Sequence, residues 1–176
     1  MNLTPTKIAG VYRVQLEPRG DPRGYFARIF DLEKFREIAP AFQIAQINRS
    51  LTRSKGTIRG LHYQREPRAE DKLVQCLHGA IFDVAVDLRP GSPTYRQWVG
   101  QELSAGNKEL LLVPKGCAHG FQTLTEDCLV EYFVSEYYAP GAEGGVRWSD
   151  PAIGVKWPLP HPSTSEKDAV WPLLEP

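Results

Sequence analysis

Short stretches in which hydrophobic and polar residues alternate dominate the pattern along this chain. In Ala80–Leu88 every second residue from Phe82 onward is large and apolar, and the opposite set includes two aspartates. Cys128–Ser135 alternates in the same way and places Tyr132 with the apolar set. A period of two is that of a β-strand with one face toward a core. Both stretches are therefore predicted to be strands, and Tyr132 is predicted to point inward.

The rest of the chain has the same strand-rich pattern. Leu73–Leu77 and Lys108–Val113 are short apolar runs, and His78 sits beside Gly79 in a predicted hairpin turn. Fifteen prolines and fifteen glycines divide the chain into short pieces, as in strand-rich domains. One short helix is predicted at Asp31–Ala39, where apolar residues share a face and a proline follows. Many short strands and few helices predict an all-β jelly roll or sandwich.

The length of 176 residues suits one domain with a substantial core, so we expect a single domain over 1–176. Its last part, about 158–176, is rich in proline and polar residues, which by composition alone indicates a loose segment. Trp157 and Trp171 argue against that, because an exposed tryptophan is unfavourable. We expect this segment to pack back on the barrel.

Composition limits the partners and the compartment. Lysine plus arginine and aspartate plus glutamate number 21 each, so no charge excess favours nucleic acid or an anionic membrane. No apolar run approaches the roughly 20 residues of a membrane span, and the first residues lack the apolar core of a signal peptide. Three cysteines without paired spacing suit free thiols in a reducing compartment. We expect a cytoplasmic protein that binds neither nucleic acid nor membrane.

Two histidine motifs carry the candidate chemistry. Five residues separate Gly56 from His62, and Pro114-Lys115-Gly116-Cys117-Ala118-His119 follows about fifty residues later. This spacing resembles the cupin pattern and predicts that both histidines lie on strands of one barrel. A metal-binding cupin continues as His-x-His, whereas the second position here is Gln64. The ligand set is therefore incomplete, and we expect no metal and no redox cofactor.

Several side chains near these motifs could run acid–base chemistry. A histidine is a suitable general base when a carboxylate fixes its tautomer, and an inward tyrosine can be the opposing acid. A nearby cation can hold a developing oxyanion. Base, acid and cation around a carbon next to a carbonyl are the minimal set for epimerisation. The candidates are His62, His119, Lys72, Tyr132, Asp83 and Asp168.

Over nearly its whole length the chain resembles the dTDP-4-dehydrorhamnose 3,5-epimerases. The resemblance is carried, in order, by Asp21–Phe26, Gln46–Ser50, Gly56–Gln64, Asp83–Arg89, Ser92–Tyr95, Val113–Phe121, Trp148–Pro151 and Ser165–Asp168. It implies a cupin-type double-stranded β-helix jelly roll, normally a homodimer. The implied activity is that of an isomerase of dTDP-rhamnose and polysaccharide biosynthesis. Its substrate would be a nucleotide-diphosphate sugar with a 4-keto-6-deoxy ring, inverted at carbon 3 and carbon 5.

The resemblance also implies a role for particular residues. His62 would be the base, Asp168 its carboxylate partner and Tyr132 the acid, with Lys72 and His119 around the sugar carbonyl. The implied substrate contacts are Arg23, Phe26, Arg28, Gln46, Asn48, Arg59, His119, Tyr138, Glu143 and Lys167. Arg28 departs from the family, which usually has a glutamate there.

Other functions remain open on the sequence. An epimerase of carbon 3 only, or of carbon 5 only, would look nearly the same and could use another nucleotide. A metal-dependent cupin enzyme is disfavoured by Gln64 and by Thr123, which stands where a further ligand is often found. A non-catalytic sugar-nucleotide binder is disfavoured because residues suited to the base, acid and cation roles are all present.

Overall fold

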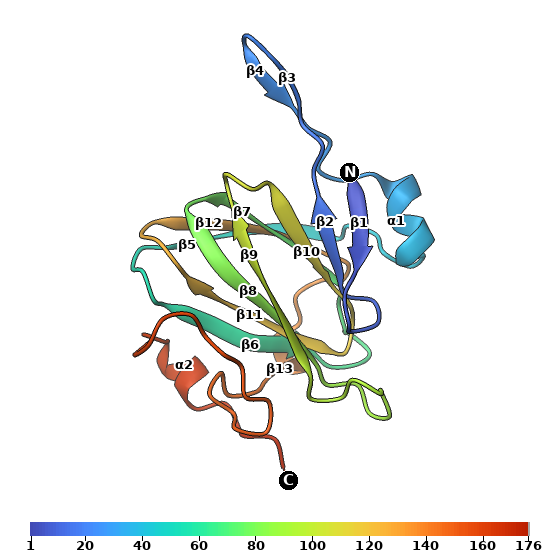
Figure 1. The fold of residues 1–176 in the computed structure, drawn as a ribbon. Helices are drawn as coiled ribbons and strands as arrows, with labels where there is room; N and C mark the ends of the chain where they lie inside the picture. Colours follow the sequence, from blue (N-terminus) through green and yellow to red (C-terminus); the bar gives the residue numbers. More distant parts are fainter. Residues whose placement is uncertain (176) are drawn as a thin grey trace.

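The computed structural model describes residues 1–175, which are built around two antiparallel sheets from which a two-stranded hairpin projects (Figure 1). The six-stranded sheet has the order β1 (Asn2–Pro5), β2 (Tyr12–Gln15), β10 (Glu109–Val113), β7 (Lys72–His78), β12 (Cys128–Val134) and β5 (Gln46–Thr52). The five-stranded sheet has the order β13 (Glu143–Gly145), β6 (Ile58–Gln64), β11 (Cys117–Thr123), β8 (Ala80–Asp87) and β9 (Trp98–Ser104). The remaining elements are β3 (Arg19–Asp21), β4 (Gly24–Phe26), α1 (Leu32–Ile38), the 3-10 helix η1 (Pro140–Ala142) and α2 (Glu166–Ala169). The prediction of a cupin-type jelly roll is confirmed.

The main core lies between the two sheets. Val74 and Val130 of the six-stranded sheet pack in one buried cluster with Ala85 and Phe121 of the five-stranded sheet. Burying each such apolar side chain contributes roughly 1.5–3 kcal/mol relative to leaving it in water. The alternation along β12 arises because one face of this strand meets that core, and Tyr132 packs at the edge of the same cluster.

Chain segments cover both outer faces as well. Helix α1 packs Phe35 on the outer face of the six-stranded sheet, beside Phe42 and Leu112, and this helix confirms the prediction at Asp31–Ala39. On the other sheet, the outward Val84 of β8 is covered by apolar residues from the last third of the chain, including Ile153, Trp157 and Leu174. Both faces of β8 are therefore buried. Among residues 1–175 we find no helix with the length and hydropathy needed to span a membrane.

One local prediction is wrong. The turn at His78 and Gly79 does not close a hairpin, because β7 and β8 belong to different sheets and are not paired. Gly79 has a φ of +77°, and a Cβ there would lie 2.5 Å from the Thr125 hydroxyl oxygen. This glycine therefore lets the chain turn tightly as it passes from one sheet to the other.

A close approach of β6 and β11 sets the position of the two histidines. Gly60 has a φ of +132°, and a Cβ on it would lie 2.6 Å from the Cα of Gly120. The absence of side chains at both positions lets the two strands come together there. In the resulting register His62 lies directly opposite His119, which confirms that the two motifs occupy neighbouring strands of one barrel.

Candidate active site

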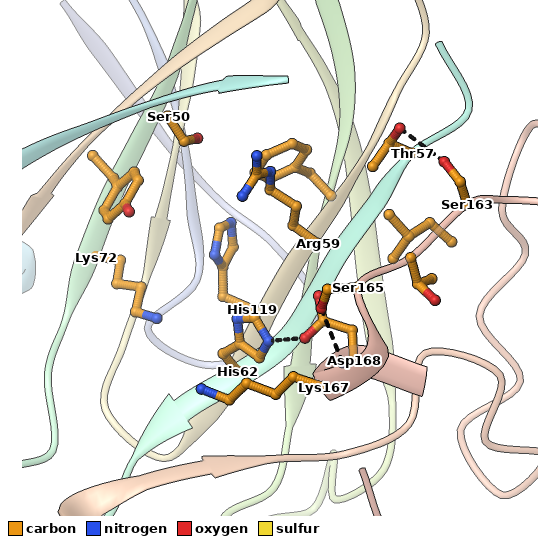
Figure 2. Close-up of a pocket in the computed structure, with 14 residues that line it drawn as sticks. Ser50, Thr57, Arg59, His62, Lys72, His119, Ser163, Ser165, Lys167 and Asp168 are labelled. Carbon is orange, nitrogen blue, oxygen red and sulfur yellow. Dashed lines mark hydrogen bonds and ion pairs between the residues drawn. The ribbon is translucent and has the colours of Figure 1, made fainter. Parts of the chain in front are cut away.

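The two histidines face a cavity of ≈ 480 Å³ between the sheets (Figure 2). A second cavity of ≈ 390 Å³ also contacts His62, Lys72 and Tyr132, so these three residues stand where the two spaces meet. The first is further lined by Ser50, Thr57, Ile58, Arg59, His119, Phe121, Ser163, Thr164, Ser165, Lys167 and Asp168. The second is further lined by Gln46, Asn48, Tyr63, Gln64, Glu70, Val134, Tyr138 and Glu143. Eleven predicted site residues therefore surround one region, since only the three from the N-terminal hairpin segment are missing from both linings.

His62 and Asp168 form a close pair although 106 positions separate them in the sequence. The distance from His62 Nε2 to Asp168 Oδ1 is 2.5 Å, and the side chains are 32% and 5% exposed. The backbone N–H of Gly60 donates to Asp168 Oδ2 at 3.3 Å. Burial raises the pKa of Asp168, but the hydrogen bond and charge of His62 outweigh this and lower it overall. A charged carboxylate can only accept, so Nε2 carries a proton and Nδ1 is the nitrogen free to take another.

Tyr132 faces His62 from the opposite sheet. It stands on β12, while His62 stands on β6, and both line the same two cavities. Burial raises the pKa of the Tyr132 hydroxyl, and the nearby charge of Arg59 opposes this only in part. The hydroxyl therefore keeps its proton near neutral pH, which is the state that a proton donor needs.

A second histidine–carboxylate pair lies deeper in the barrel. The distance from His119 Nε2 to Asp83 Oδ1 is 2.8 Å, and the Asp83 side chain is fully buried. Burial raises the pKa of Asp83, and the charge and hydrogen bond of His119 oppose the rise. The alternation along β8 indicated a carboxylate on this face, but it could not indicate which side chain would pair with it.

Lys72 is the cationic side chain where the two cavities meet. Its Nζ lies 3.2 Å from Glu70 Oε1, and the two side chains are 13% and 11% exposed. Gln64 Nε2 in turn donates to Glu70 at 3.3 Å and to the Arg68 carbonyl oxygen at 2.9 Å, and Gln64 Oε1 accepts from the Ala139 N–H at 2.7 Å. Gln64 therefore holds the strand end and the loop around the lysine. Glu70 is a site residue that the sequence motifs did not indicate.

The outer part of the region is polar, and hydrogen bonds and an ion pair fix several of its side chains. Arg59 donates from Nε to the Thr52 hydroxyl oxygen at 2.8 Å, which fixes its guanidinium beside the cavity. Lys167 Nζ lies 2.5 Å from Glu143 Oε2, and the Tyr138 hydroxyl donates to the same oxygen at 3.3 Å. Burial raises the pKa of Glu143, but the hydrogen bond and charge of Lys167 lower it overall. Gln46 accepts from the Tyr138 N–H at 2.8 Å.

Three predicted substrate contacts are absent from these cavities. Arg23 and Phe26 stand on the projecting β3–β4 hairpin, with the Arg23 side chain 90% exposed and Phe26 67% exposed (Figure 1). Arg28 follows the hairpin and pairs with Asp31 at 3.3 Å. The hairpin leads away from the barrel, so it does not bring these residues to the pocket of its own chain.

Residues 1–175 contain no group of three or more histidine, cysteine, aspartate or glutamate side chains placed to share a metal ion. Thr123, at the other position where a ligand was considered, donates its hydroxyl to the Ser54 carbonyl oxygen at 2.8 Å.

A jelly roll with a histidine–carboxylate base facing a tyrosine defines the class of cupin-fold enzymes that move protons on a bound substrate. Comparison with known proteins is more specific. Residues 5–176 match the family model described as dTDP-4-dehydrorhamnose 3,5-epimerase. The chain is 47% identical over 168 residues to the dTDP-4-dehydrorhamnose 3,5-epimerase of Sinorhizobium fredii, covering 95% of this chain and 86% of that protein. The chain belongs to the dTDP-4-dehydrorhamnose 3,5-epimerase family and is an isomerase.

Two further matches bear on the site and on the reaction. The crystal structure of the Bacillus anthracis dTDP-4-dehydrorhamnose 3,5-epimerase with TDP and PPi bound has a TM-score of 0.94 and 42% identity, covering 98% of this chain and 99% of that one. A relative from Streptomyces niveus is a dTDP-4-dehydrorhamnose 3-epimerase, 37% identical over 169 residues and covering 96% of this chain and 81% of that protein. Family membership alone therefore leaves open which carbons are inverted.

Proposed function

We propose that the protein inverts carbon 3 and carbon 5 of a dTDP-linked 4-keto-6-deoxy sugar, converting dTDP-4-dehydro-6-deoxyglucose to dTDP-4-dehydrorhamnose. The observation that carries this proposal is the His62–Asp168 pair on one sheet, facing Tyr132 on the other across a shared cavity. The family match supplies the substrate class.

The proposed reaction is a proton transfer through an enolate. Nδ1 of His62 takes the proton from the carbon next to the 4-keto group, and the C–H electron pair moves into the ring to form the enolate. Asp168 stabilises the imidazolium that results. Lys72 and His119 stabilise the negative charge on the carbonyl oxygen. The Tyr132 hydroxyl then delivers a proton to the opposite face, the carbonyl re-forms, and exchange with solvent restores both groups.

The nucleotide is assigned to the polar outer part of the site. Arg59 would contact the diphosphate or the sugar. The residues that would hold the nucleotide line the neighbouring space: Gln46, Asn48, Tyr138, Glu143 and Lys167. The proposed proton transfers involve no oxidation or reduction, so they need no redox cofactor.

Deuterium incorporation tests which carbons react. In heavy water the protein should introduce solvent deuterium at both carbon 3 and carbon 5 of dTDP-4-dehydro-6-deoxyglucose, because the catalytic groups exchange their protons with solvent. Proton NMR reads the loss of each ring signal. Exchange at carbon 3 alone would favour the alternative of a 3-epimerase, which the Streptomyces niveus relative supports. Exchange at neither carbon would contradict the proposal.

We further propose that the protein works as a homodimer in which the β3–β4 hairpin reaches the pocket of the partner. Tyr25 and Phe26 on the hairpin are 62% and 67% exposed, which is unfavourable for aromatic side chains left in solvent. The edge strand β5, beside the pocket, exposes Ile47 and Leu51 on its outer face. An arrangement with two-fold symmetry would cover such surfaces reciprocally.

Mixing two inactive variants tests this arrangement. A variant with Arg23→Ala and Phe26→Ala should lose activity through its hairpin, and His62→Ala should lose it through its pocket. After the subunits exchange in equal amounts, heterodimers contain one intact pocket facing one intact hairpin, so about a quarter of wild-type activity should return. Co-refolded homodimers of each variant serve as the controls. Failure of the mixture to regain activity would contradict the shared site.

We also propose a cytoplasmic location. Cys76, Cys117 and Cys128 are free and buried, and burial raises the pKa of Cys76 and of Cys117 to about 12. These thiols are therefore poor nucleophiles, which fits a structural role in a reducing compartment.

A further inference from the structure

The catalytic carboxylate stands on a very short helix that needs support from elsewhere. Asp168 belongs to α2, which has four residues, far fewer than a helix needs to be stable alone. On the N-terminal side, the Ile58 N–H donates to the Ser163 carbonyl oxygen at 2.8 Å, and the Thr57 and Ser163 hydroxyls lie 3.0 Å apart (Figure 2). These contacts join the segment to β6, but they leave the C-terminal side of α2 to be held by something else.

Trp171 provides the contact on that side. A Cβ at Gly145 would lie 2.3 Å from the Trp171 ring, so the indole occupies the space that a side chain at position 145 would fill. Gly145 pairs with His62 in the β13–β6 register. The backbone is held as well, because Arg147 Nε donates to the Trp171 carbonyl oxygen at 3.0 Å. The ring thus packs over Gly145, on one face of the β13–β6 pair and next to His62.

The Trp171 ring contacts His62 itself and Lys167, the residue before Asp168. Its edge meets the His62 imidazole, with centroids 6.1 Å apart and planes inclined at 64°. The ammonium of Lys167, which precedes Asp168 on α2, lies 5.6 Å from the centre of the indole ring, within range of a cation–π contact. Among residues 1–175 the buried Nε1 of Trp171 has no hydrogen-bond partner. The packing of the indole, rather than a hydrogen bond from its Nε1, therefore holds the Trp171 side chain in place.

We propose that Trp171 is a positioning residue, which keeps α2 against β6 so that Asp168 stays in contact with His62. This inference rests on the proposed roles of His62 and Asp168. Without the indole, α2 loses its side-chain contact on the C-terminal side and keeps only the backbone hydrogen bonds from Arg147 there. The 2.5 Å contact between Asp168 and His62 should then lengthen. The imidazolium formed during proton abstraction then loses its carboxylate partner, and turnover falls.

The pH dependence of kcat separates this role from a general loss of folding. The charged or titratable groups that share a cavity lining with His62 come from both sheets and from α2. They are Asp168 and Lys167 on α2, Glu143 on β13, Arg59 and Tyr63 on β6, Lys72 on β7, His119 on β11, Tyr132 on β12, and Glu70 and Tyr138 in loops. Only those on α2 are expected to move when the indole is removed. Asp168 pairs directly with the proposed base, so weakening that pair should move the acid limb of the kcat profile. A smaller folded fraction would lower the apparent kcat at every pH and leave the acid limb at the same pH.

The experiment compares Trp171→Ala with Trp171→Phe and with Val170→Ala, a neighbouring residue that is 72% exposed. Trp171→Ala should lower kcat about 10- to 100-fold, as expected when a catalytic group is displaced by about 1 Å, and it should shift the acid limb. Trp171→Phe should restore most activity and the normal limb, since no hydrogen bond is lost. Val170→Ala should match wild type both in kcat and in the position of the acid limb.

A second variant covers the case in which Trp171→Ala does not fold. Gly145→Ala keeps the indole but adds a methyl group where the ring lies, so it should produce the same limb shift. An unshifted limb in the folded variants would overturn the role of Trp171. His62→Ala distinguishes a wrong role for Trp171 from a wrong proposed chemistry. If only the role of Trp171 is wrong, His62→Ala should still be inactive. Retained activity in His62→Ala would contradict both the proposed base and the role of Trp171.

Discussion

Replacing His62 with alanine should lower kcat by about 10³-fold or more, within the range that a general base contributes, while the protein stays folded. His62 is the one imidazole that pairs with Asp168, and alanine leaves nothing at that position to accept the ring proton. The partly exposed side chain is not part of an apolar core cluster, so its loss leaves the core packing intact. Asp168 loses its partner, which lowers the free energy of unfolding, but it keeps the hydrogen bond from the Gly60 N–H. Deuterium incorporation at the sugar carbons, followed by NMR, gives the exchange rate directly.

The matched control is His78→Ala. This histidine is exposed, and it lines neither cavity of the site; its Nδ1 lies 2.9 Å from the Asp127 carbonyl oxygen. Its replacement should leave both exchange and turnover close to wild type. If His62→Ala exchanged deuterium as fast as wild type, another group would have to be the base, and the pairing with Asp168 would be structural only.

The sequence predicted elements well wherever the relevant forces were local. Period-two alternation identified β8 and β12 because each of their faces meets a different environment, and Pro40 marked the end of α1 because proline cannot continue a helix. The His78 and Gly79 turn misled because a glycine turn specifies a sharp change of direction, but not the strand with which the next segment pairs. That choice is made by long-range packing between sheets.

The site residues divide in the same way, into those that a local pattern predicts and those that depend on long-range contacts. The alternation along Cys128–Ser135 correctly placed Tyr132 on an inward face, and the cupin-like spacing of the two histidine motifs correctly placed His62 and His119 on strands of the same barrel. Asp168 could be proposed only from the family resemblance, because nothing local shows that a residue in a polar tail returns to β6. The pairing of Asp83 with His119 follows from the register of β8 and β11, and Glu70 lies in the loop before β7. Both became visible only in three dimensions. The hairpin residues Arg23 and Phe26 belong to a family motif but do not line the His62 cavities of their own chain, since a motif does not specify where the hairpin that carries it will point.

Tyr132→Phe should separate proton removal from inversion. The substitution deletes only the hydroxyl, so the ring still packs beside the core cluster that it contacts. His62 should still remove the ring proton and return a solvent-derived one to the same face. The rate of inversion should fall by about 10²- to 10³-fold, as for loss of a general acid, while deuterium still enters the recovered substrate. NMR of the recovered sugar and of the product measures both rates in one sample.

The ratio of exchange to inversion is the decisive quantity, because a general loss of activity would lower both rates together. Tyr138→Phe is the matched control. Its hydroxyl also lies at the site, where it donates to Glu143 at 3.3 Å, but it is assigned to the nucleotide rather than to the ring carbons. It should therefore invert and exchange in the wild-type ratio, with any loss confined to KM. If the ratio rose in Tyr138→Phe and not in Tyr132→Phe, Tyr138 would be the acid. The proton would then reach the sugar from the outer part of the site and not from β12.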